Sequence, residues 1–305
     1  MILKETVGAG EAGMRLDDGA SLLFRSLSKS RIRGIIELGG CAVNGVMCRV
    51  ASRRLREGDS LVLGVMEPGR FRELVLSAAD ILYEDGDFLA VGKPAGFSSQ
   101  RTPYQLKGTL EHAVGVYLKG QGIDGPVRIV HRLDRGTSGV MLFPKSRTAA
   151  ALLSKRFREG EVEKVYLALA RGEAPAREWI VDAPIAKVGP ARYGAVRPGK
   201  EAKTEFRVAA QGKGAVLLEA RPLTGRTHQI RVHLALSGLP IVGDSTYDGP
   251  PGPRLMLHCA AMAFVDQSGK RVDVSAPVDG EFAAACRGFA VTAGGGDGPG
   301  RFRGV

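Results

Sequence analysis

Between residues 14 and 39, apolar residues recur at a spacing that predicts two helices. Leucines within 16–27 have approximate helical spacing, which Gly19 interrupts. A second helix is expected to begin after Ser28 or Ser30, either of which can cap it, and to end at Gly39. Three isoleucines between these limits would form its apolar face.

A hairpin and a strand are expected directly after these helices. The dipeptide Asn44-Gly45 lies between two valines and is typical of a two-residue type I′ turn. Residues 55–65 then read as a strand that begins after Gly58-Asp59. Residues 14–68 are therefore expected to form one small domain, preceded by a flexible N-terminus over 1–13.

The rest of the chain predicts a larger domain over 81–290, after a linker over 69–80. Two short strands are expected on either side of Asp85-Gly86, and two buried strands on either side of "DRGTSG". Further elements are expected as a helix over 148–158, strands over 163–172, 203–210 and 214–223, a charged surface segment over 187–200, and a helix capped by Thr227 that ends near Gly238. This order predicts an α+β fold with a mainly antiparallel sheet, and residues 291–305 are expected to form a flexible tail.

Charge favours a polyanionic partner. The 305 residues carry 43 Lys and Arg against 32 Asp and Glu, a net charge of +11. Residues 14–66 hold nine basic residues against five acidic ones, and Lys29, Arg31 and Arg33 gather at the start of the second predicted helix, where the helix dipole disfavours cations. A phosphate-binding face explains this cluster better than a merely solvated one.

Several other classes of protein find little support. No apolar run approaches the roughly 20 residues that span a bilayer, and the N-terminus lacks the apolar core of a signal peptide. The four cysteines show neither zinc-ligand nor disulfide spacing. We therefore expect a cytoplasmic protein, a monomer, with no membrane partner, metal or cofactor.

One short segment, "HRLDRGTSG", carries the clearest candidate chemistry. It places a single carboxylate, Asp134, between Arg132 and Arg135 in a turn between apolar groups. Aspartate is common in turns for structural reasons alone. A carboxylate on a loop that two core strands support, however, would be held rigidly, and its arginine neighbours would keep it ionised.

Two known families resemble this chain. The stretch from Arg15 to Leu63, with its Arg-Leu-Asp start, basic helix, Asn-Gly hairpin and Gly-Asp strand, is similar to the S4 RNA-binding module. The segments "HRLDRGTSG", "EKVYLALARG" and "TGRTHQIRVH", in this order and after "YEDGDFLAVGKPAG", resemble the motifs of RluA-type pseudouridine synthases. Together the two resemblances cover most of the chain.

The second resemblance implies a role for several residues in the isomerisation of uridine. Asp134 would attack either C6 of the uracil or C1′ of the ribose, Tyr166 would stack on the base and assist removal of the C5 proton, and Arg231 would hold Asp134 ionised. Arg132 would fill the gap that the flipped nucleotide leaves. His131 would shape the turn, and RNA contacts are further expected from Lys29, Arg31, Arg33 and Arg226. One covalent carboxylate suits this reaction, whereas a glycosidase normally needs two.

The expected substrate is large-subunit (23S) ribosomal RNA, with transfer RNA as the alternative. A non-catalytic S4-type RNA-binding protein is a second class to be tested. An RNA methyltransferase is a third, and it would need a cofactor loop. The chain offers only the GxGxxG match at Gly8, Gly10 and Gly13, where "MILKET" is too short and polar for a buried parallel strand.

Overall fold

The computed structural model describes residues 2–37, 39–65, 73–102, 105 and 107–291. The chain divides into two compact units. The first comprises Met1–Val75 and Ser98–Gly125, and the second comprises Leu76–Phe97 and Pro126–Val305. The expected boundaries differ from this division, because they place residues 98–125 in the larger domain. The expected tail from residue 292 onward, and residues 69–72 of the expected linker, lie outside the described residues.

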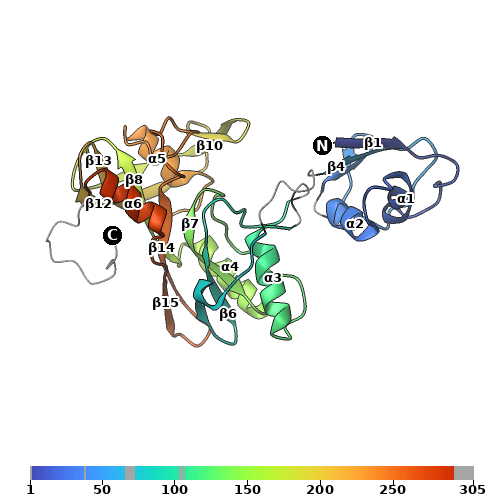
Figure 1. Ribbon diagram of the computed structural model, residues 1–305, viewed down its shortest axis with the longest axis horizontal. Helices are drawn as coiled ribbons and strands as arrows, with labels where there is room; N and C mark the ends of the chain where they lie inside the picture. Colours follow the sequence, from blue (N-terminus) through green and yellow to red (C-terminus); the bar gives the residue numbers. More distant parts are fainter. Residues whose placement is uncertain (1, 38, 66–72, 103–104, 106, 292–305) are drawn as a thin grey trace. The chain divides into compact units, whose positions relative to one another are not determined.

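The first unit begins with a small four-stranded sheet and two helices, coloured blue in Figure 1. The strand order is β1-β4-β2-β3, and every pair is antiparallel. Its elements are β1 (Ile2–Thr6), α1 (Leu16–Leu23), α2 (Lys29–Glu37), β2 (Cys41–Val43), β3 (Val46–Met47) and β4 (Ser60–Gly64), with α3 (Leu110–Gly120) later in the chain. The two expected helices and the hairpin are confirmed.

The hairpin turn of the first unit follows its sequence closely. Asn44 and Gly45 both have positive φ, 53° and 77°, as a type I′ turn requires. The Asn44 amide donates to Asp59 Oδ1 at 2.8 Å and accepts the backbone N–H of Ser60 at 2.8 Å. These bonds join the hairpin to the start of β4.

The expectation of a flexible N-terminus is wrong for Ile2–Thr6. These residues form β1, which pairs with β4 along its whole length, because β4 would otherwise leave one edge of its backbone without partners. A strand therefore does precede Gly8, contrary to the sequence prediction. It is antiparallel and belongs to a small sheet, so the parallel strand that a dinucleotide-binding loop requires is not present there.

The second unit is built on a nine-stranded sheet. Its order is β5-β6-β7-β14-β8-β13-β12-β9, with β15 paired to β14. All pairs are antiparallel except β7 with β14, which confirms the α+β class with a mainly antiparallel sheet. The strands are β5 (Ile81–Glu84), β6 (Phe88–Lys93), β7 (Ser138–Pro144), β8 (Glu163–Arg171), β9 (Glu178–Asp182), β12 (Lys203–Gln211), β13 (Ala215–Pro222), β14 (Leu257–Val265) and β15 (Arg271–Ser275).

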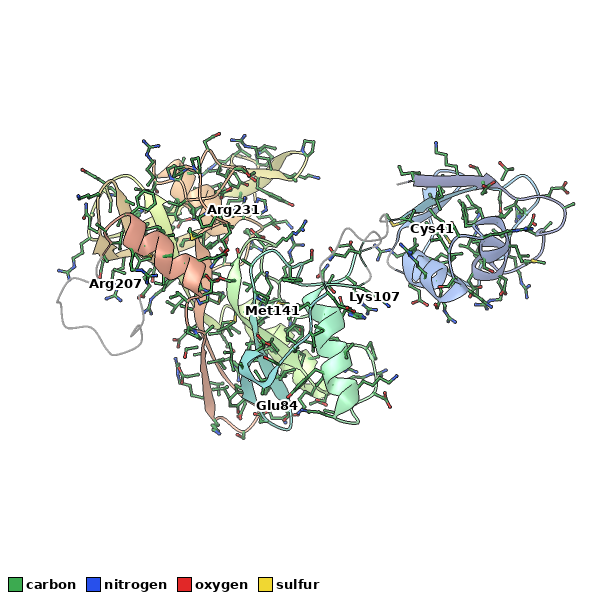
Figure 2. The ribbon with its side chains drawn as sticks, viewed as in Figure 1. Cys41, Glu84, Lys107, Met141, Arg207 and Arg231 are labelled. Carbon is green, nitrogen blue, oxygen red and sulfur yellow. The ribbon has the colours of Figure 1, made fainter. Side chains whose placement is uncertain are left out.

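Helices pack against this sheet in two places (Figure 1). Near β7, α4 (Arg147–Glu159) buries Ala149 and Leu153 in one core cluster. Near β8, β12 and β13, α5 (Gln229–Leu236) and α6 (Gly280–Gly288) contribute to another. Figure 2 marks Met141, buried in β7, and Arg231, on the first turn of α5.

The parallel contact between β7 and β14 depends on a glycine. Gly139 pairs with Cys259 and has φ 112°. A Cβ at this position would lie 2.1 Å from the carbonyl oxygen of Cys259, so only glycine allows this approach. The glycine of "TSG" therefore has a packing role directly after the turn that carries Asp134.

Two local predictions for the second unit are wrong, and one surface segment is more ordered than expected. Residues 126–133 form no strand, although their apolar residues are typical of a buried strand. The charged segment around 187–200 contains an antiparallel hairpin, β10 (Ile185–Gly189) and β11 (Arg192–Ala195). The N-cap of α5 is His228, in the left-handed region at φ 57°, and not Thr227.

Within the described residues, no helix combines the length and apolarity needed to cross a membrane. The four cysteines are buried and unbridged. Across the same residues, no three His, Cys, Asp or Glu side chains gather in a way that could hold a metal ion.

Candidate active site

Asp134 lies in a tight turn immediately before β7. Its backbone carbonyl accepts the N–H of Thr137 at 3.0 Å, which closes the turn, and β7 is buried at every position. The side chain of Asp134 is 18% exposed. A rigid strand thus presents one partly exposed carboxylate, as expected, although the support before the turn is not a strand.

Lys93 ties a second loop to this turn. Its ammonium donates to the carbonyl oxygens of Pro94, Phe97 and Arg135 at 3.1, 2.8 and 3.3 Å. Gly96 and Arg135 add two bonds between the same loops, each 2.8 Å long. The three donors of the lysine are all used, so the residue fixes the turn that carries the carboxylate.

The environment of Lys93 is unusual for a lysine. The residue is 1% exposed, and burial lowers its pKa to about 7 against the opposing charge of Asp134. Arg254 and Arg135 lower this pKa further. The ammonium is therefore held by carbonyl dipoles, with no described carboxylate bonded to it.

Arg231 connects two carboxylates. Its Nη1 donates to Asp134 Oδ2 at 3.2 Å, while Nε and Nη2 donate to the two oxygens of Asp244, each at 2.7 Å. Burial would lower the pKa of Arg231, but the bonds and charges of Asp244 and Asp134 outweigh burial and raise it. The guanidinium is thus permanently charged, and Asp244 fixes the orientation in which it donates to Asp134.

Tyr247 and His228 surround this ion pair. The guanidinium carbon of Arg231 lies 5.0 Å from the centre of the Tyr247 ring, a cation–π contact. His228 Nε2 lies 3.7 Å from Asp134 Oδ2, and its Nδ1 lies 2.9 Å from the Tyr247 hydroxyl. Burial lowers the pKa of His228 against the attraction of Asp134. The imidazole is therefore favoured in its neutral form.

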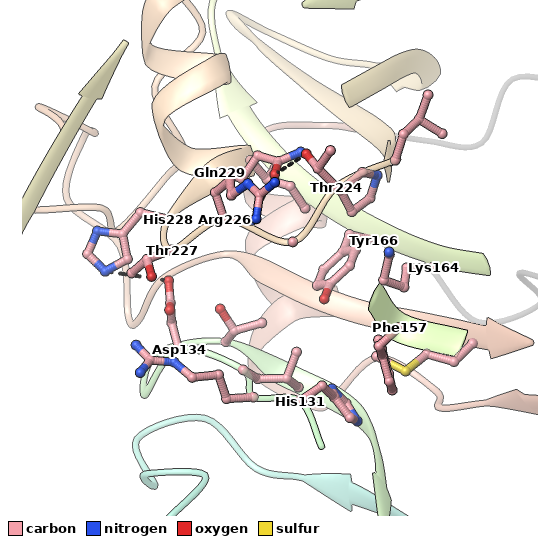
Figure 3. A pocket seen from close by; sticks show the side chains of 18 of the residues that line it. His131, Asp134, Phe157, Lys164, Tyr166, Thr224, Arg226, Thr227, His228 and Gln229 are labelled. Carbon is pink, nitrogen blue, oxygen red and sulfur yellow. Dashed lines mark hydrogen bonds and ion pairs between the residues drawn. The ribbon is translucent and has the colours of Figure 1, made fainter. Parts of the chain in front are cut away.

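A pocket of about 710 Å³ opens in front of these groups. Asp134, Tyr166 and Arg231 all line it, and Figure 3 shows the first two projecting into it from different segments. The volume falls within the usual range for small-molecule sites and is large enough for a nucleotide. The structure thus brings together the three residues that the sequence analysis expected to be catalytic.

Tyr166 enters the pocket from β8. It pairs across the sheet with Cys259 on β14, and it is partly buried. Burial raises the pKa of its hydroxyl well above the ordinary value, and the nearby Cys259 and Asp134 act in the same direction. The hydroxyl is therefore neutral in the free protein.

His131 supports the turn. Its Nε2 accepts the backbone N–H of Leu142 at 2.8 Å, and its ring stacks on Phe157 with centroids 4.6 Å apart. The Leu142 N–H of β7 thus has the His131 side chain as its acceptor in place of a strand carbonyl. Residues 126–133 can therefore lie beside β7 without forming a strand. Burial lowers the pKa of His131 to about 3.

Arg132 and Arg226 lie at the pocket and are exposed. Arg226 Nε donates to the carbonyl of Glu201 at 2.9 Å, and its backbone N–H is accepted by Gln229. The structure gives no hydrogen bond or ion pair of the Arg132 guanidinium with another described residue. Both cations can therefore reach a ligand in the pocket.

The other three expected RNA-binding residues lie on α2 of the first unit. Lys29 pairs with Asp18 at 2.5 Å, and Arg33 pairs with Glu37 at 3.0 Å across one helical turn. Arg31 lies between them on the same helix, and its backbone N–H is accepted by the Ser28 hydroxyl. The basic face is thus partly neutralised by acids, which the sequence analysis did not foresee.

Sequence reasoning missed Lys93, Asp244 and Tyr247, and it gave His228 no role in the site. The signal for Lys93 was present in the Lys-Pro-Ala-Gly loop. Asp244 and Tyr247 lie in the polar segment "GDSTYDG", which reads as an ordinary turn. Nothing local in that segment indicates that it returns to Arg231.

Comparisons with known proteins agree with this geometry. The sequence model of the RNA pseudouridylate synthase family matches residues 87–236. The chain is 38% identical over 241 residues to an uncharacterized RNA pseudouridine synthase of Aquifex aeolicus strain VF5, with 76% of each chain covered. It is 32% identical over 298 residues to ribosomal large subunit pseudouridine synthase C of Escherichia coli strain K12, with 90% of this chain and 92% of the relative covered.

A solved structure supports the same fold. Human RNA pseudouridylate synthase domain containing 4 matches with a TM-score of 0.60 at 23% identity, covering 70% of this chain and 93% of the human one. At this identity the match speaks for the fold alone.

Proposed function

The chain belongs to the family of RNA pseudouridine synthases and is an RNA-modifying isomerase, and on that premise we propose that Asp134 is its catalytic nucleophile. The observation that carries the proposal is the partly exposed carboxylate of Asp134, which lines the pocket and is held by an arginine. Asp134 is held by Arg231 at 3.2 Å, and Arg231 is itself fixed by Asp244. A permanently charged guanidinium pairs with the carboxylate and orients it toward the pocket, as a covalent nucleophile requires.

The reaction needs no net gain or loss of atoms. Asp134 adds to C6 of the uracil or to C1′ of the ribose, and the bond between C1′ and N1 breaks. The uracil turns within the pocket, a bond forms between C5 and C1′, and release of the carboxylate restores the free enzyme. The proton leaves C5, and N1 gains one. Both routes use one carboxylate, so the choice between C6 and C1′ stays open.

We assign three further residues at the pocket to contacts with the target uridine and the RNA around it. Tyr166 stacks on the flipped base from the β8 side of the pocket, a position in keeping with its neutral hydroxyl. Arg132 is exposed at the pocket and fills the place of the extruded nucleotide in the RNA. Arg226 contacts a neighbouring phosphate, because its side chain is exposed near the same opening.

The substrate we propose is large-subunit ribosomal RNA. The E. coli relative, which the chain matches over nine-tenths of its length, is a ribosomal large subunit pseudouridine synthase. Transfer RNA is the alternative substrate. We further propose that the first unit is an S4-type RNA-binding module, whose basic helix α2 carries Lys29, Arg31 and Arg33. The cytoplasm, where ribosomal RNA is found, is the proposed location.

A cofactor-free assay tests the reaction and the substrate together. Ribosomal RNA and transfer RNA transcripts, each labelled with tritium at C5 of uridine, are incubated with the purified protein and no added cofactor. Release of label from ribosomal RNA, with pseudouridine at the labelled position, supports the proposal. Release from transfer RNA alone would move the substrate to the alternative, and a requirement for a methyl donor would reject the reaction.

A further inference from the structure

Two donors approach the same oxygen of Asp134. Arg231 Nη1 lies 3.2 Å from Oδ2, and His228 Nε2 lies 3.7 Å from that atom. Among the described residues, no hydrogen bond or ion pair to Oδ1 is found. The carboxylate is thus anchored through one oxygen, and the other is available to a ligand in the pocket (Figure 3).

The tautomer of His228 follows from its other nitrogen. The Tyr247 hydroxyl accepts the backbone N–H of Tyr193 at 3.1 Å, and it lies 2.9 Å from His228 Nδ1. Of these two partners, only Nδ1 can accept the phenolic proton. Tyr247 therefore donates to Nδ1, and a neutral imidazole then carries its own proton on Nε2, the nitrogen that faces Asp134.

The surroundings of His228 favour this neutral form. Burial lowers the pKa of the imidazole, the carboxylates of Asp134 and Asp244 raise it, and the cations of Arg231 and Arg132 lower it. The rings of Tyr193 and Tyr247 meet it edge-on, at centroid distances of 5.4 and 5.7 Å.

The backbone gives a further reason to assign His228 a role. The residue has φ 57° and caps α5 without a side-chain bond to the helix. A residue other than glycine in the left-handed region of the backbone is uncommon, and such conformations gather at functional sites. The side chain instead spans the distance between Tyr247 and Asp134.

We propose that His228 is a positioning residue for Asp134. Its Nε2–H, fixed by Tyr247, joins Arg231 in holding Oδ2 and leaves Oδ1 as the oxygen that attacks the nucleoside. The present separation of 3.7 Å is longer than a hydrogen bond. Bonds of this kind tighten when substrate binds. The inference rests on the proposed role of Asp134 as nucleophile.

Two substitutions test the Nε2–H donor of His228 separately from the backbone conformation of this residue and from its contact with Tyr247. In His228→Asn, the amide reaches the position of Nδ1 but not that of Nε2, and asparagine tolerates positive φ. In His228→Gln, the longer side chain can place an N–H near the position of Nε2. We expect kcat to fall about ten-fold in the Asn variant, with KM for RNA within two-fold, and to recover most of this loss in the Gln variant.

The tautomer is measured separately by ¹⁵N NMR of histidine-labelled protein, with His228→Asn used to assign the signals. The expected spectrum shows His228 protonated at Nε2 and unprotonated at Nδ1 near neutral pH. Protonation at Nδ1 in the neutral ring would overturn the inference. Equal kcat values in the Asn and Gln variants, whether both low or both normal, would also overturn it.

The controls distinguish this inference from the proposed function. If Asp134→Asn is inactive while His228→Asn retains full kcat, only the role of His228 fails. If Asp134→Asn itself retains activity, the nucleophile is wrong, and the positioning role fails with it.

Discussion

The guanidinium of Arg231 donates to both oxygens of Asp244 at 2.7 Å and to Asp134 at 3.2 Å, so one buried carboxylate orients the cation that serves the other. The side chain of Asp244 is 1% exposed, against 18% for Asp134. The two acids therefore have different tasks, because one is enclosed and structural and the other faces the pocket.

Loss of Asp244 is expected to impair both stability and activity. In Asp244→Asn, one amide N–H would face Arg231, and the buried cation would lose the more enclosed of its two charge partners. We expect the free energy of unfolding to fall by about 3 kcal/mol and kcat to fall at least ten-fold. Chemical denaturation and C5 label release measure the two effects. Exposed Asp182→Asn is the matched control, and an equal loss in both variants would argue against the special role of Asp244.

Lys93 is expected to act through the turn that carries Asp134. Lys93→Met fills a similar volume but removes all three bonds to carbonyl oxygens. The prediction is a lower kcat with little change in RNA affinity, because Lys93 is enclosed and cannot contact RNA. Affinity is measured by filter binding and kcat by label release. Unchanged kcat would show that the turn holds its shape without the lysine.

His131 predicts a specific sensitivity to acid. Its folded pKa is about 3, whereas that of a histidine in the unfolded chain is about 6.5. Between these values the unfolded chain binds more protons, so the contribution of His131 is present above pH 6.5 and is lost as the pH falls toward 3. The loss is at most about 1.4 kcal/mol per pH unit.

His131→Gln provides the comparison for this effect, since glutamine can accept the Leu142 N–H without titrating. Denaturant unfolding at pH 7.5 and pH 5 gives the stability of each protein. Between these two values, the wild type is expected to lose more stability than the variant. Parallel losses would mean that His131 is accessible to protons in the folded state.

The basic helix α2 predicts the salt dependence of RNA binding. Replacing Lys29, Arg31 and Arg33 by Ala should weaken binding and flatten the plot of log affinity against log salt, by about 0.7 to 0.9 for each phosphate that the helix no longer neutralises. Arg287→Ala, an exposed arginine of the other unit, is the control. An unchanged slope in the triple variant would reject a phosphate-binding face on α2.

The acids that pair with this helix give the opposite prediction. Asp18→Asn and Glu37→Gln release Lys29 and Arg33 from their ion pairs and should tighten RNA binding at low salt. The same titration measures the change. Weaker binding would indicate that the ion pairs themselves shape the RNA-binding face.

Local chemistry explains which parts of the fold could be predicted from sequence. The hairpin at Asn44-Gly45 requires positive φ at both positions, and α2 shows both its apolar face and its cap, so these elements are recognisable alone. The edge strand β9 and the hairpin β10–β11 are short, and most of their positions are exposed or half-buried, so none of them shows the buried apolar run of a central strand. The apolar run of β14 carried a strand signal that the sequence analysis did not use.

In the candidate site, too, local sequence predicts some residues and not others. Asp134, Tyr166 and Arg231 each lie in a recognisable motif, and the fold brings them to one pocket. Residues 126–133 resemble a strand in sequence because burial against α4 and the pocket demands apolar residues just as a strand does. Asp244 could not be found in this way, because its partner is determined by the path of the chain after α5.

The proposed role of Asp134 is tested most directly by Asp134→Asn, which keeps the shape of the side chain and removes its charge and nucleophilicity. The measurement is the rate of C5 label release from ribosomal RNA at saturating protein, together with RNA affinity and thermal unfolding to show that binding and folding persist. We expect no detectable release with affinity within a few-fold of wild type. Release within ten-fold of the wild-type rate would contradict a nucleophilic role for Asp134.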